Sequence, residues 1–180
     1  MNIIMLGKPG SGKGTVGKML SEQLEIIHLS SGELFRSYIK KAGEIGKEID
    51  KYVSQGKLVP DDLAIRLVEK RLQEIDCKNG VILDGFPRTV KQAEELDKFF
   101  KQKGCKIDIA VELRLSDQDI IDRIVKRMVC SNVDCREIYN TEFKKPKQEG
   151  ICDKCGSKLI KRQDDTIETV QQRLKTYHET

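Results

Sequence analysis

The sequence predicts one α/β domain in which a mostly parallel sheet is flanked by helices. Short apolar runs typical of buried strands alternate along the chain with longer stretches of helical periodicity, and this alternation favours βαβ units. A glycine-rich turn directly follows the first apolar run, as expected where a strand leads into a helix. The 180 residues are enough for one compact domain with a sizeable core.

The expected elements follow in order along the chain. Strands are predicted over residues 2–6, 26–29, 80–83 and 109–115. Helices are predicted over residues 13–24, 32–41, 45–55, 61–75, 90–103, 117–128 and 167–177. Asp61 and Asp62 follow Pro60 at a helix start, where acidic side chains suit the helix dipole. Ser116 has the side chain of an N-cap for the helix that begins at Asp117.

The periodic pattern breaks between Cys130 and Leu159, where Cys, Asn, Lys, Gly and Pro are frequent. We interpret this stretch as a small inserted subdomain. Residues 126–163 contain ten lysines and arginines against five aspartates and glutamates, a net charge of +5, whereas the whole chain carries +4. Positive charge is therefore concentrated in one segment, and the rest of the chain is close to neutral.

The overall composition excludes several classes of function. A net charge of +4 is too mild to require nucleic acid as a partner, and no apolar stretch approaches the ~20 residues of a membrane span. No basic segment with an apolar run and a cleavage site precedes the first strand. We therefore expect a cytoplasmic protein that binds neither nucleic acid nor membranes.

Residues 7–15, GKPGSGKGT, are the most informative stretch of the chain. They fit the pattern G-x-x-x-x-G-K and lie between a predicted strand and a predicted helix, which is the context that this motif needs. The backbone N–H groups of such a turn point inward, above the positive end of the helix dipole, and form a cradle for phosphate. Lys13 would reach the outer phosphates as a positive point charge.

The second phosphate signature is VILDGFPRT, residues 81–89. Here a strand ends in Asp84, at the carboxyl edge of the sheet, where ligands of open α/β sheets bind. An aspartate at this place can hold a magnesium ion through water beside the phosphates. Arg88 follows on the same loop and can bind phosphate through two parallel N–H groups.

Further arginines indicate that the site stabilises charge on several oxygens at once, as phosphoryl transfer requires. Arg36 lies on the helix of SSGELFR, and Arg123 and Arg127 are spaced to share one helix face. Arg162 follows the inserted segment, and Arg173 lies on the last helix. Four other arginines are interpreted as solvated surface residues: Arg66, Arg71, Arg114 and Arg136.

Four cysteines have the spacing of a structural metal site. Four residues separate Cys130 from Cys135 and two separate Cys152 from Cys155, with sixteen residues between the pairs. We expect the four thiolates to bind zinc, because disulfides are disfavoured in a reducing compartment. The other two cysteines and the two histidines are interpreted as non-catalytic: Cys77 and Cys105 as inert thiols at or near the core, His28 as packed and His178 as solvated.

Together these motifs resemble those of the adenylate kinases, and in particular of the bacterial type with a long, zinc-bearing lid. The resemblance runs from the first residue to the last. Several motifs are specific to the nucleoside monophosphate kinase group: GKPGSGKGT, SSGELFR, QGKLVPDD, LDGFPRT with Gln92 nearby, DRIVKR, and KRQDD followed by Arg173.

The resemblance implies a P-loop kinase fold and reversible phosphoryl transfer from MgATP to AMP, giving two ADP, in adenine nucleotide homeostasis. Residues 30–59 would form an NMP-binding subdomain and residues 126–163 the lid, within one domain over residues 1–180. The implied cofactors are Mg²⁺ with ATP and a structural Zn²⁺ on Cys130, Cys135, Cys152 and Cys155.

The resemblance also implies a role for each matching residue. Those implied to bind ATP are Gly10, Ser11, Gly12, Lys13, Gly14, Thr15, Arg123, Ile138 and Tyr139. Those implied to bind AMP are Ser31, Arg36, Lys57, Leu58, Val59, Gly85, Phe86, Pro87, Arg88, Gln92, Arg162 and Arg173. Those implied in catalysis are Lys13, Asp84, Arg88, Arg127, Arg162 and Arg173.

Three departures from the family pattern bear on these expectations. Ser31 stands where threonine is more frequent, and it keeps the hydroxyl. The first cysteine pair has four intervening residues where two are typical, which is within the range of zinc sites. The family usually continues for ~30 to 40 residues more, about one βα unit, with a final strand and helix. Strand 109–115 is therefore expected to be an exposed apolar edge, and a monomer is expected with a dimer through this edge as the alternative.

Three other functions stay open at this point. A kinase for UMP or CMP is one, although Ser31 and Gln92 favour adenine, since glutamine can pair with an adenine edge by two hydrogen bonds. A zinc-ribbon module for nucleic acid would need aromatic residues among the basic ones, and the inserted segment has only Tyr139 and Phe143. A truncated remnant that binds nucleotide with low activity is the third.

Overall fold

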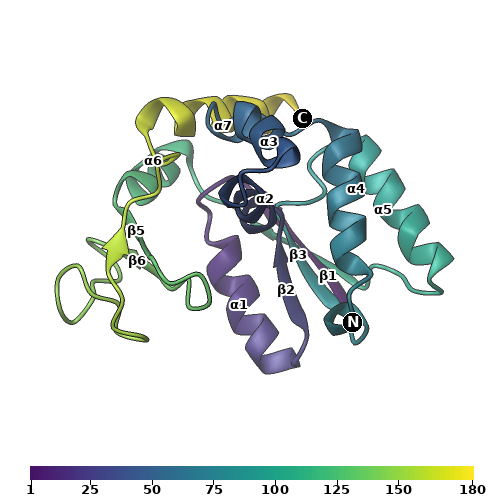
Figure 1. Cartoon of the computed structure of the whole chain (residues 1–180), viewed down its shortest axis with the longest axis horizontal. Helices are drawn as coiled ribbons and strands as arrows, with labels where there is room; N and C mark the ends of the chain where they lie inside the picture. Colours follow the sequence, from purple (N-terminus) through teal and green to yellow (C-terminus); the bar gives the residue numbers. More distant parts are fainter.

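The computed structural model describes all 180 residues, and its centre is a four-stranded parallel sheet (Figure 1). The strand order is β2-β3-β1-β4, which confirms the predicted α/β class. The strands are β1 (Asn2–Gly7), β2 (Ile27–Ser30), β3 (Val81–Asp84) and β4 (Ile109–Leu113). Because all four run in the same direction, the ends of β1, β2 and β3 meet at one edge of the sheet, and Met5 lies opposite Asp84 there.

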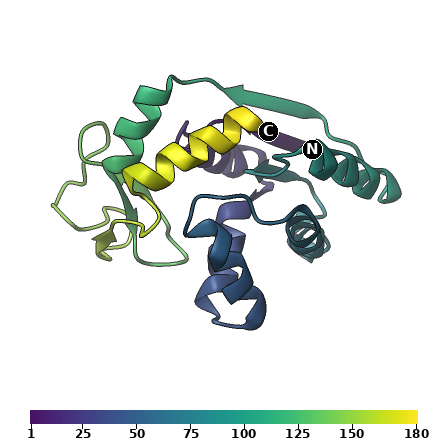
Figure 2. The same cartoon turned by 90° about the horizontal axis from the view of Figure 1, so that it is seen from above.

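Helices cover both faces of the sheet. Helix α1 (Lys13–Leu24) lies on one face, and α4 (Asp61–Leu72) and α5 (Val90–Gln102) lie on the other (Figure 1). Helices α2 (Ser31–Lys40) and α3 (Glu44–Val53) project away from the sheet (Figure 2). The helix predicted over residues 61–75 is shorter than expected, because the chain turns after Leu72 into a short 3₁₀ helix at Ile75–Cys77.

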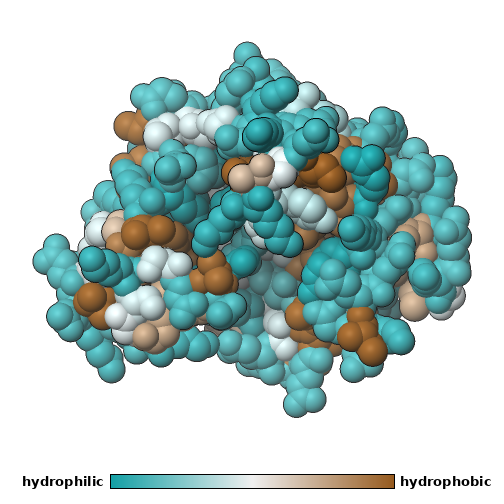
Figure 3. Space-filling view, in the orientation of Figure 1, coloured by the Kyte–Doolittle hydropathy of each residue, from teal (hydrophilic) through white to brown (hydrophobic).

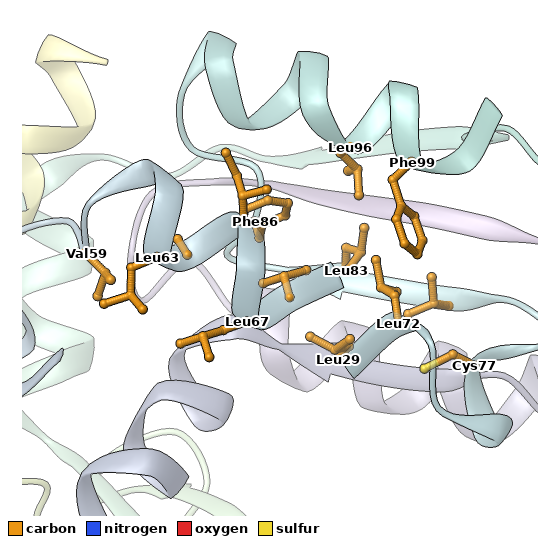
Figure 4. Packing of buried hydrophobic residues seen from close by; sticks show 14 of the residues in the cluster. Leu29, Val59, Leu63, Leu67, Leu72, Cys77, Leu83, Phe86, Leu96 and Phe99 are labelled. Carbon is orange, nitrogen blue, oxygen red and sulfur yellow. The ribbon is translucent and has the colours of Figure 1, made fainter. Parts of the chain in front are cut away.

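The larger part of the core lies between the sheet and α4 with α5. Sixteen buried residues form one cluster there, which includes Leu29 and Leu83 of the sheet together with residues of both helices (Figure 4). A smaller cluster on the opposite face joins Ile3, Met5 and Ile82 to α1. This alternation of inward-facing side chains between the two faces explains the continuous apolar runs of the strands.

The inserted segment forms a small sheet of its own, which we call the lid sheet. Its strands are β5 (Arg127–Cys130), β6 (Ile138–Asn140) and β7 (Leu159–Ile160), in the antiparallel order β6-β5-β7. The prediction of a helix over residues 117–128 is wrong at its end, since α6 (Asp117–Val125) stops before β5. The backbone of β5 pairs with strands on both sides, and these distant partners override the local helical pattern.

Two helices connect the lid sheet to the rest of the molecule. Helix α7 (Ile167–Glu179) crosses over the body beside α6, and the two share a buried cluster of Ile120, Ile124, Val170 and Leu174 (Figure 2). Ser116 and Thr166 cap their N-termini, each accepting a hydrogen bond from the backbone N–H three residues later.

Three further expectations can be compared with the structure. Strand β4 is an edge strand with β1 as its only neighbour, and Ile109 on it is exposed, as predicted. Cys77 is buried, but the placement of Cys105 near the core is wrong, because it lies exposed in the loop after α5. None of the helices has the length and apolar character that crossing a bilayer requires.

Candidate active site

The glycine-rich loop connects β1 to α1 in the geometry of a phosphate cradle. Gly10 has a φ of 81°, and a Cβ at this position would lie 2.6 Å from the side chain of Ile124, so a larger residue would be strained and would clash. Gly12 has a φ of 101° and directly precedes the first turn of α1. The loop is therefore held against α6 with the N-terminus of α1 open beneath it.

Lys13 lies within this loop and has no acidic partner. Its Nζ donates hydrogen bonds to the carbonyl oxygens of Gly7 and Lys8, both at 2.7 Å. Burial lowers the pKa of Lys13 to about 8, against the attraction of Asp84, and nearby Arg88 and Arg127 lower it further. A buried cation among other cations is an unfavourable arrangement that a bound anion would relieve.

Asp84 ends β3 next to the loop and is 8% exposed. A Cβ on Gly14 would lie 3.3 Å from its Oδ2, and the Nε2 of His28 lies 3.5 Å from the same oxygen. Burial works against the charge of this carboxylate, but His28 and Lys13 outweigh it and hold the pKa of Asp84 below its ordinary value. Asp84 is therefore ionised at neutral pH, and its contact with His28 was missed by treating that histidine as a packed side chain only.

Two aspartates organise the arginines of the site. Asp165 is 1% exposed and accepts a hydrogen bond at 2.8 Å from the Nε of Arg127 on β5. Asp164 forms an ion pair with Arg173 of α7 and lies 3.7 Å from Arg36 of α2. Neither aspartate was singled out from the sequence, although both belong to KRQDD. A pair of adjacent acids directly after the basic segment was the available signal.

The site carries an excess of positive charge. It gathers Lys13, Arg36, Arg88, Arg127, Arg162 and Arg173 around three acids, Asp84, Asp164 and Asp165. Two of the arginines form no ion pair: Arg88 donates from Nε to the carbonyl of Gly85 at 2.8 Å, and Arg162 has no acid within bonding distance. Burial, with repulsion from Arg36 and Arg127, lowers the pKa of Arg162 to about 9, so it remains charged at neutral pH. The arrangement is suited to bind polyanions such as phosphates.

A second group of residues extends the site away from the glycine-rich loop. Ser31 is 1% exposed, and its hydroxyl donates to the carbonyl of Gly85 at 2.6 Å. The side-chain oxygen of Gln92 accepts from the backbone N–H of Arg88 at 2.8 Å. A hydrogen-bonded chain thus runs from Ser31 through Gly85 and Arg88 to Gln92.

The neighbours of this second group differ in exposure. Phe86 belongs to the buried core, whereas Arg88 remains open to solvent. The loop from Lys57 to Val59 follows α3, with Lys57 exposed and Val59 buried. This loop is fixed against α7, because a Cβ on Gly56 would lie 2.8 Å from the carbonyl oxygen of Thr169.

The sequence is similar to those of known adenylate kinases. The sequence model of the family described as adenylate kinase matches residues 5–180. The adenylate kinase of Clostridium tetani is 50% identical over 177 residues, which cover 98% of this chain and 81% of the relative. Those of Ruminiclostridium cellulolyticum and Lachnospira eligens are 49% and 48% identical over 99% of this chain and 82% and 83% of the relatives.

The chain belongs to the adenylate kinase family. It is therefore a nucleoside monophosphate kinase, a phosphotransferase whose substrates are ATP and AMP and which uses Mg²⁺ with ATP.

In this adenylate kinase, the predicted ATP-binding residues Arg123 and Tyr139 do not point into the charged cluster. Arg123 is exposed on α6, with its guanidinium 6.0 Å from the ring centre of Phe143. Tyr139 is 3% exposed, and its hydroxyl accepts from the backbone N–H of Asp153 at 2.8 Å. A contact of this segment with ATP would therefore come from its backbone or from half-buried Ile138, and not from the Tyr139 ring. Arg123 and Arg127 do not share a helix face as predicted, since Arg127 lies on β5.

The four lid cysteines converge at one point. Their Sγ atoms all lie within 4.8 Å of one another, with Cys130 and Cys155 at 3.4 Å and Cys135 and Cys152 at 3.7 Å. Sulfurs that bind one zinc ion at about 2.3 Å in a tetrahedron are about 3.8 Å apart. Hydrogen bonds from Ser157 lower the pKa of Cys155 to about 6, whereas burial raises the pKa of Cys130 to about 12, so the fit to a metal ion rests on the positions of the four sulfurs. The residues present therefore fit a metal ion of this kind.

Ion pairs connect the lid to the body beside the cysteines. Lys18 of α1 contacts Glu137 at 2.8 Å, and Arg136 contacts Glu33 of α2 at 2.8 Å. Arg136 was predicted to be a solvated surface residue; its side chain is 41% exposed, but it is paired with Glu33 and not free in solvent. It has a left-handed backbone conformation with a φ of 47°, and its position in the folded lid, next to α2, could not be read from its neighbours in sequence.

Proposed function

We propose that the two groups of site residues hold the two substrates of the reaction in which MgATP and AMP give two ADP. Gly10, Ser11, Gly12, Lys13, Gly14 and Thr15 bind the phosphates of ATP, and Arg123 with the Ile138–Tyr139 segment binds ATP from the lid side. The observation that carries this proposal is the excess of cations, and above all Arg88 and Arg162, which have no acidic partner. Buried or crowded cations without counter-ions are typical of sites that bind anionic ligands.

The AMP side is built on the second group. We assign its binding to Ser31, Arg36, Lys57, Leu58, Val59, Gly85, Phe86, Pro87, Arg88, Gln92, Arg162 and Arg173. Arg88 lies on the loop after β3 and interacts electrostatically with both Asp84 and Arg173. From this position it can contact the phosphates of both substrates. The hydrogen bond from its Nε to Gly85 orients the guanidinium and leaves further N–H groups for phosphate.

Phosphoryl transfer needs little covalent chemistry from the protein, so catalysis depends on placing positive charge around the transferred group. Lys13, Arg88, Arg127, Arg162 and Arg173 supply this charge, and the hydrogen bond from Arg127 to Asp165 holds one of them in a fixed direction. Preorganised charge of this kind costs no rearrangement during the reaction. Asp84 would hold the magnesium ion through water, and that ion neutralises phosphate charge when MgATP is bound.

The division into subdomains follows from the same assignment. Residues 30–59 form the NMP-binding subdomain, and residues 126–163 form a lid with a net charge of +5. A lid of this charge is attracted to two anionic substrates, brings Arg127 and Arg162 to them and keeps water from the phosphoryl group. Zn²⁺ bound by Cys130, Cys135, Cys152 and Cys155 has a structural role there, because the lid is too small for a hydrophobic core of its own.

Both nucleotide sites are built from residues of one chain, which favours a monomer over a dimer through β4. The chemistry takes place among soluble nucleotides, which is in keeping with a cytoplasmic protein that needs neither nucleic acid nor a membrane.

The assignment is tested by a coupled assay of ADP formation from ATP and AMP. We expect Lys13→Met to lower kcat by at least about a hundredfold, the loss typical for a charge aimed at the transition state. Lys91→Met is the matched control, because Lys91 forms only an exposed ion pair with Asp62. Equal rates for Lys13→Met and the control would overturn the role given to the glycine-rich loop.

A further inference from the structure

We infer that Asp61 is a positioning residue for substrate selection, which fixes the direction of the Gln92 amide and thereby makes the site choose a 6-amino purine over a 6-oxo purine. The inference rests on the proposed role of Gln92 in AMP binding. Asp61 is the first residue of α4, and Gln92 lies in the first turn of α5. The residues are thus far apart in sequence, and neither was connected to the other by any sequence motif.

The Gln92 side chain is held from both sides. Its Nε2 donates to the Oδ1 of Asp61 at 2.7 Å, and its Oε1 accepts from the backbone N–H of Arg88 at 2.8 Å. Gln92 is 3% exposed, so water cannot easily replace either partner. Turning the amide by 180° would bring its oxygen against the Asp61 carboxylate and its NH₂ against the Arg88 N–H. Both contacts would be repulsive, and only one orientation is therefore allowed.

Asp61 is itself held in place. The hydroxyl of Thr89 donates to its Oδ2 at 3.1 Å, and the same hydroxyl accepts from the backbone N–H of Gln92 at 3.2 Å. Both carboxylate oxygens are thus engaged. The three residues form a closed ring of hydrogen bonds between α4 and α5.

The fixed amide has a chemical consequence for the base that it meets. After the bonds to Asp61 and Arg88, the amide keeps one N–H and one lone pair of its oxygen. Adenine offers a 6-amino donor beside a ring acceptor, whereas hypoxanthine offers a 6-oxo acceptor beside a ring N–H. A glutamine whose amide could turn would form hydrogen bonds with either base, whereas an amide held by Asp61 can pair with the 6-amino purine only. Mispaired polar groups at a buried site are strongly rejected.

The test compares kcat/KM for AMP with kcat/KM for inosine 5′-monophosphate, using MgATP as donor. In the wild type, turning the Gln92 amide by 180° loses both of its hydrogen bonds, to Asp61 and from Arg88. In Asp61→Asn the new amide can present either its oxygen or its NH₂ to Gln92. Turning Gln92 then loses only the bond from Arg88. We expect the ratio of AMP to inosine monophosphate to fall about tenfold, the effect of one hydrogen bond. The KM for ATP should not change.

Asp62→Asn is the matched control, because the adjacent Asp62 is exposed and contacts only Lys91. We expect it to keep the wild-type ratio. A merely structural Asp61 would give a different result: Asp61→Asn would keep the ratio, or would lower both rates equally together with the melting temperature, and either outcome overturns the inference.

A Gln92→Ala variant separates this inference from the proposed function. If Gln92→Ala lowers the ratio and Asp61→Asn does not, Gln92 reads the base without help from Asp61, and only the inference fails. If Gln92→Ala also leaves the ratio unchanged, the AMP-binding role of Gln92 fails as well. The double variant should show no further loss from the Asp61 change, since a positioning residue acts only through the residue that it positions.

Discussion

The body and the lid of this adenylate kinase are held together by different means. The body has a cluster of sixteen buried hydrophobic residues between its sheet and two helices (Figure 4). The lid has a cluster of four, Cys130, Tyr139, Cys152 and Leu159, and two of these are cysteines of the proposed metal site. Burial of apolar surface therefore suffices for the body but cannot support the lid alone.

The surface and the contacts between the two regions are mainly polar. The face seen in Figure 3 is mainly hydrophilic, with hydrophobic residues in separate small patches. Contacts of the lid with the body beside the cysteines are ionic, such as Lys18 with Glu137 and Arg136 with Glu33. Ion pairs at a surface are weak and can be broken by solvent. If the proposed metal ion holds the lid together, the lid can therefore leave the body without unfolding it.

The largest effect is expected from the metal site. Cys152→Ser should abolish metal binding and unfold the lid, because structural zinc contributes on the order of 10 kcal/mol to the folding of small domains. Elemental analysis and calorimetry would show loss of the metal together with an early transition from the lid, while the body transition stays near its original temperature. Cys105→Ser, at an exposed cysteine outside the lid, is the control and should behave as wild type. Retention of one zinc per chain in Cys152→Ser would refute the site.

The next effect concerns the body. Leu83 is fully buried between the sheet and α4 with α5, so Leu83→Ala should lower the free energy of unfolding by about 3 kcal/mol. Urea denaturation measures this, and the difference should be the same with and without chelator. Val90→Ala, at an exposed position of α5, should change stability little. A loss that appeared only after chelation would mean that body and lid are not independent.

A moderate effect is expected from pH. Burial lowers the pKa of Lys13 to about 8, so this lysine is charged below that pH and neutral above it. Since the charged form is needed for phosphate, kcat/KM should fall about tenfold for each pH unit above the pKa. Bound nucleotide favours the charged form, so the fall in kcat should begin at higher pH. In Lys13→Arg the alkaline fall should begin at a higher pH, where Arg162, with its pKa of about 9, starts to lose its charge. A wild-type profile that stays flat to about pH 10 would contradict the assignment.

The smallest effect is expected at the contact between lid and body. Lys18→Gln removes the ion pair with Glu137 and should cost less than about 1 kcal/mol of lid stability. The cost should disappear at high ionic strength, where charges at a surface are screened. Lys98→Gln removes an exposed pair within α5 and should leave the lid unchanged. A loss of several kcal/mol that persists in salt would show that the ionic contact dominates over the metal.

The body was more predictable from the sequence than the lid. The strands and the glycine-rich loop arise from local patterns of apolar residues and glycines, and the predicted helix over residues 13–24 has the bounds observed for α1. The predicted helix over residues 117–128 runs into the first two residues of β5, because the pairing of β5 with β6 and β7 on both sides is not visible in its own residues. Local pattern cannot reveal pairing of that kind.

The site shows the same contrast. Each arginine that the motifs indicated lies in the charged cluster except Arg123, whereas Asp164 and Asp165, which orient those arginines, were missed. The contact of Asp61 with Gln92 was also missed, because it joins two helices that only the fold brings together. Sequence motifs thus indicated the charged groups that we propose to bind phosphate, but not the residues that hold these groups in position.

The independence of lid and body is tested most directly by hydrogen exchange with and without a chelator. We predict that chelation accelerates exchange of the lid amides in β5, β6 and β7 by several orders of magnitude and leaves those of β1 and β3 unchanged. Equal acceleration in both regions, or no acceleration in the lid, would contradict the proposal that burial holds the body while metal and charge hold the lid.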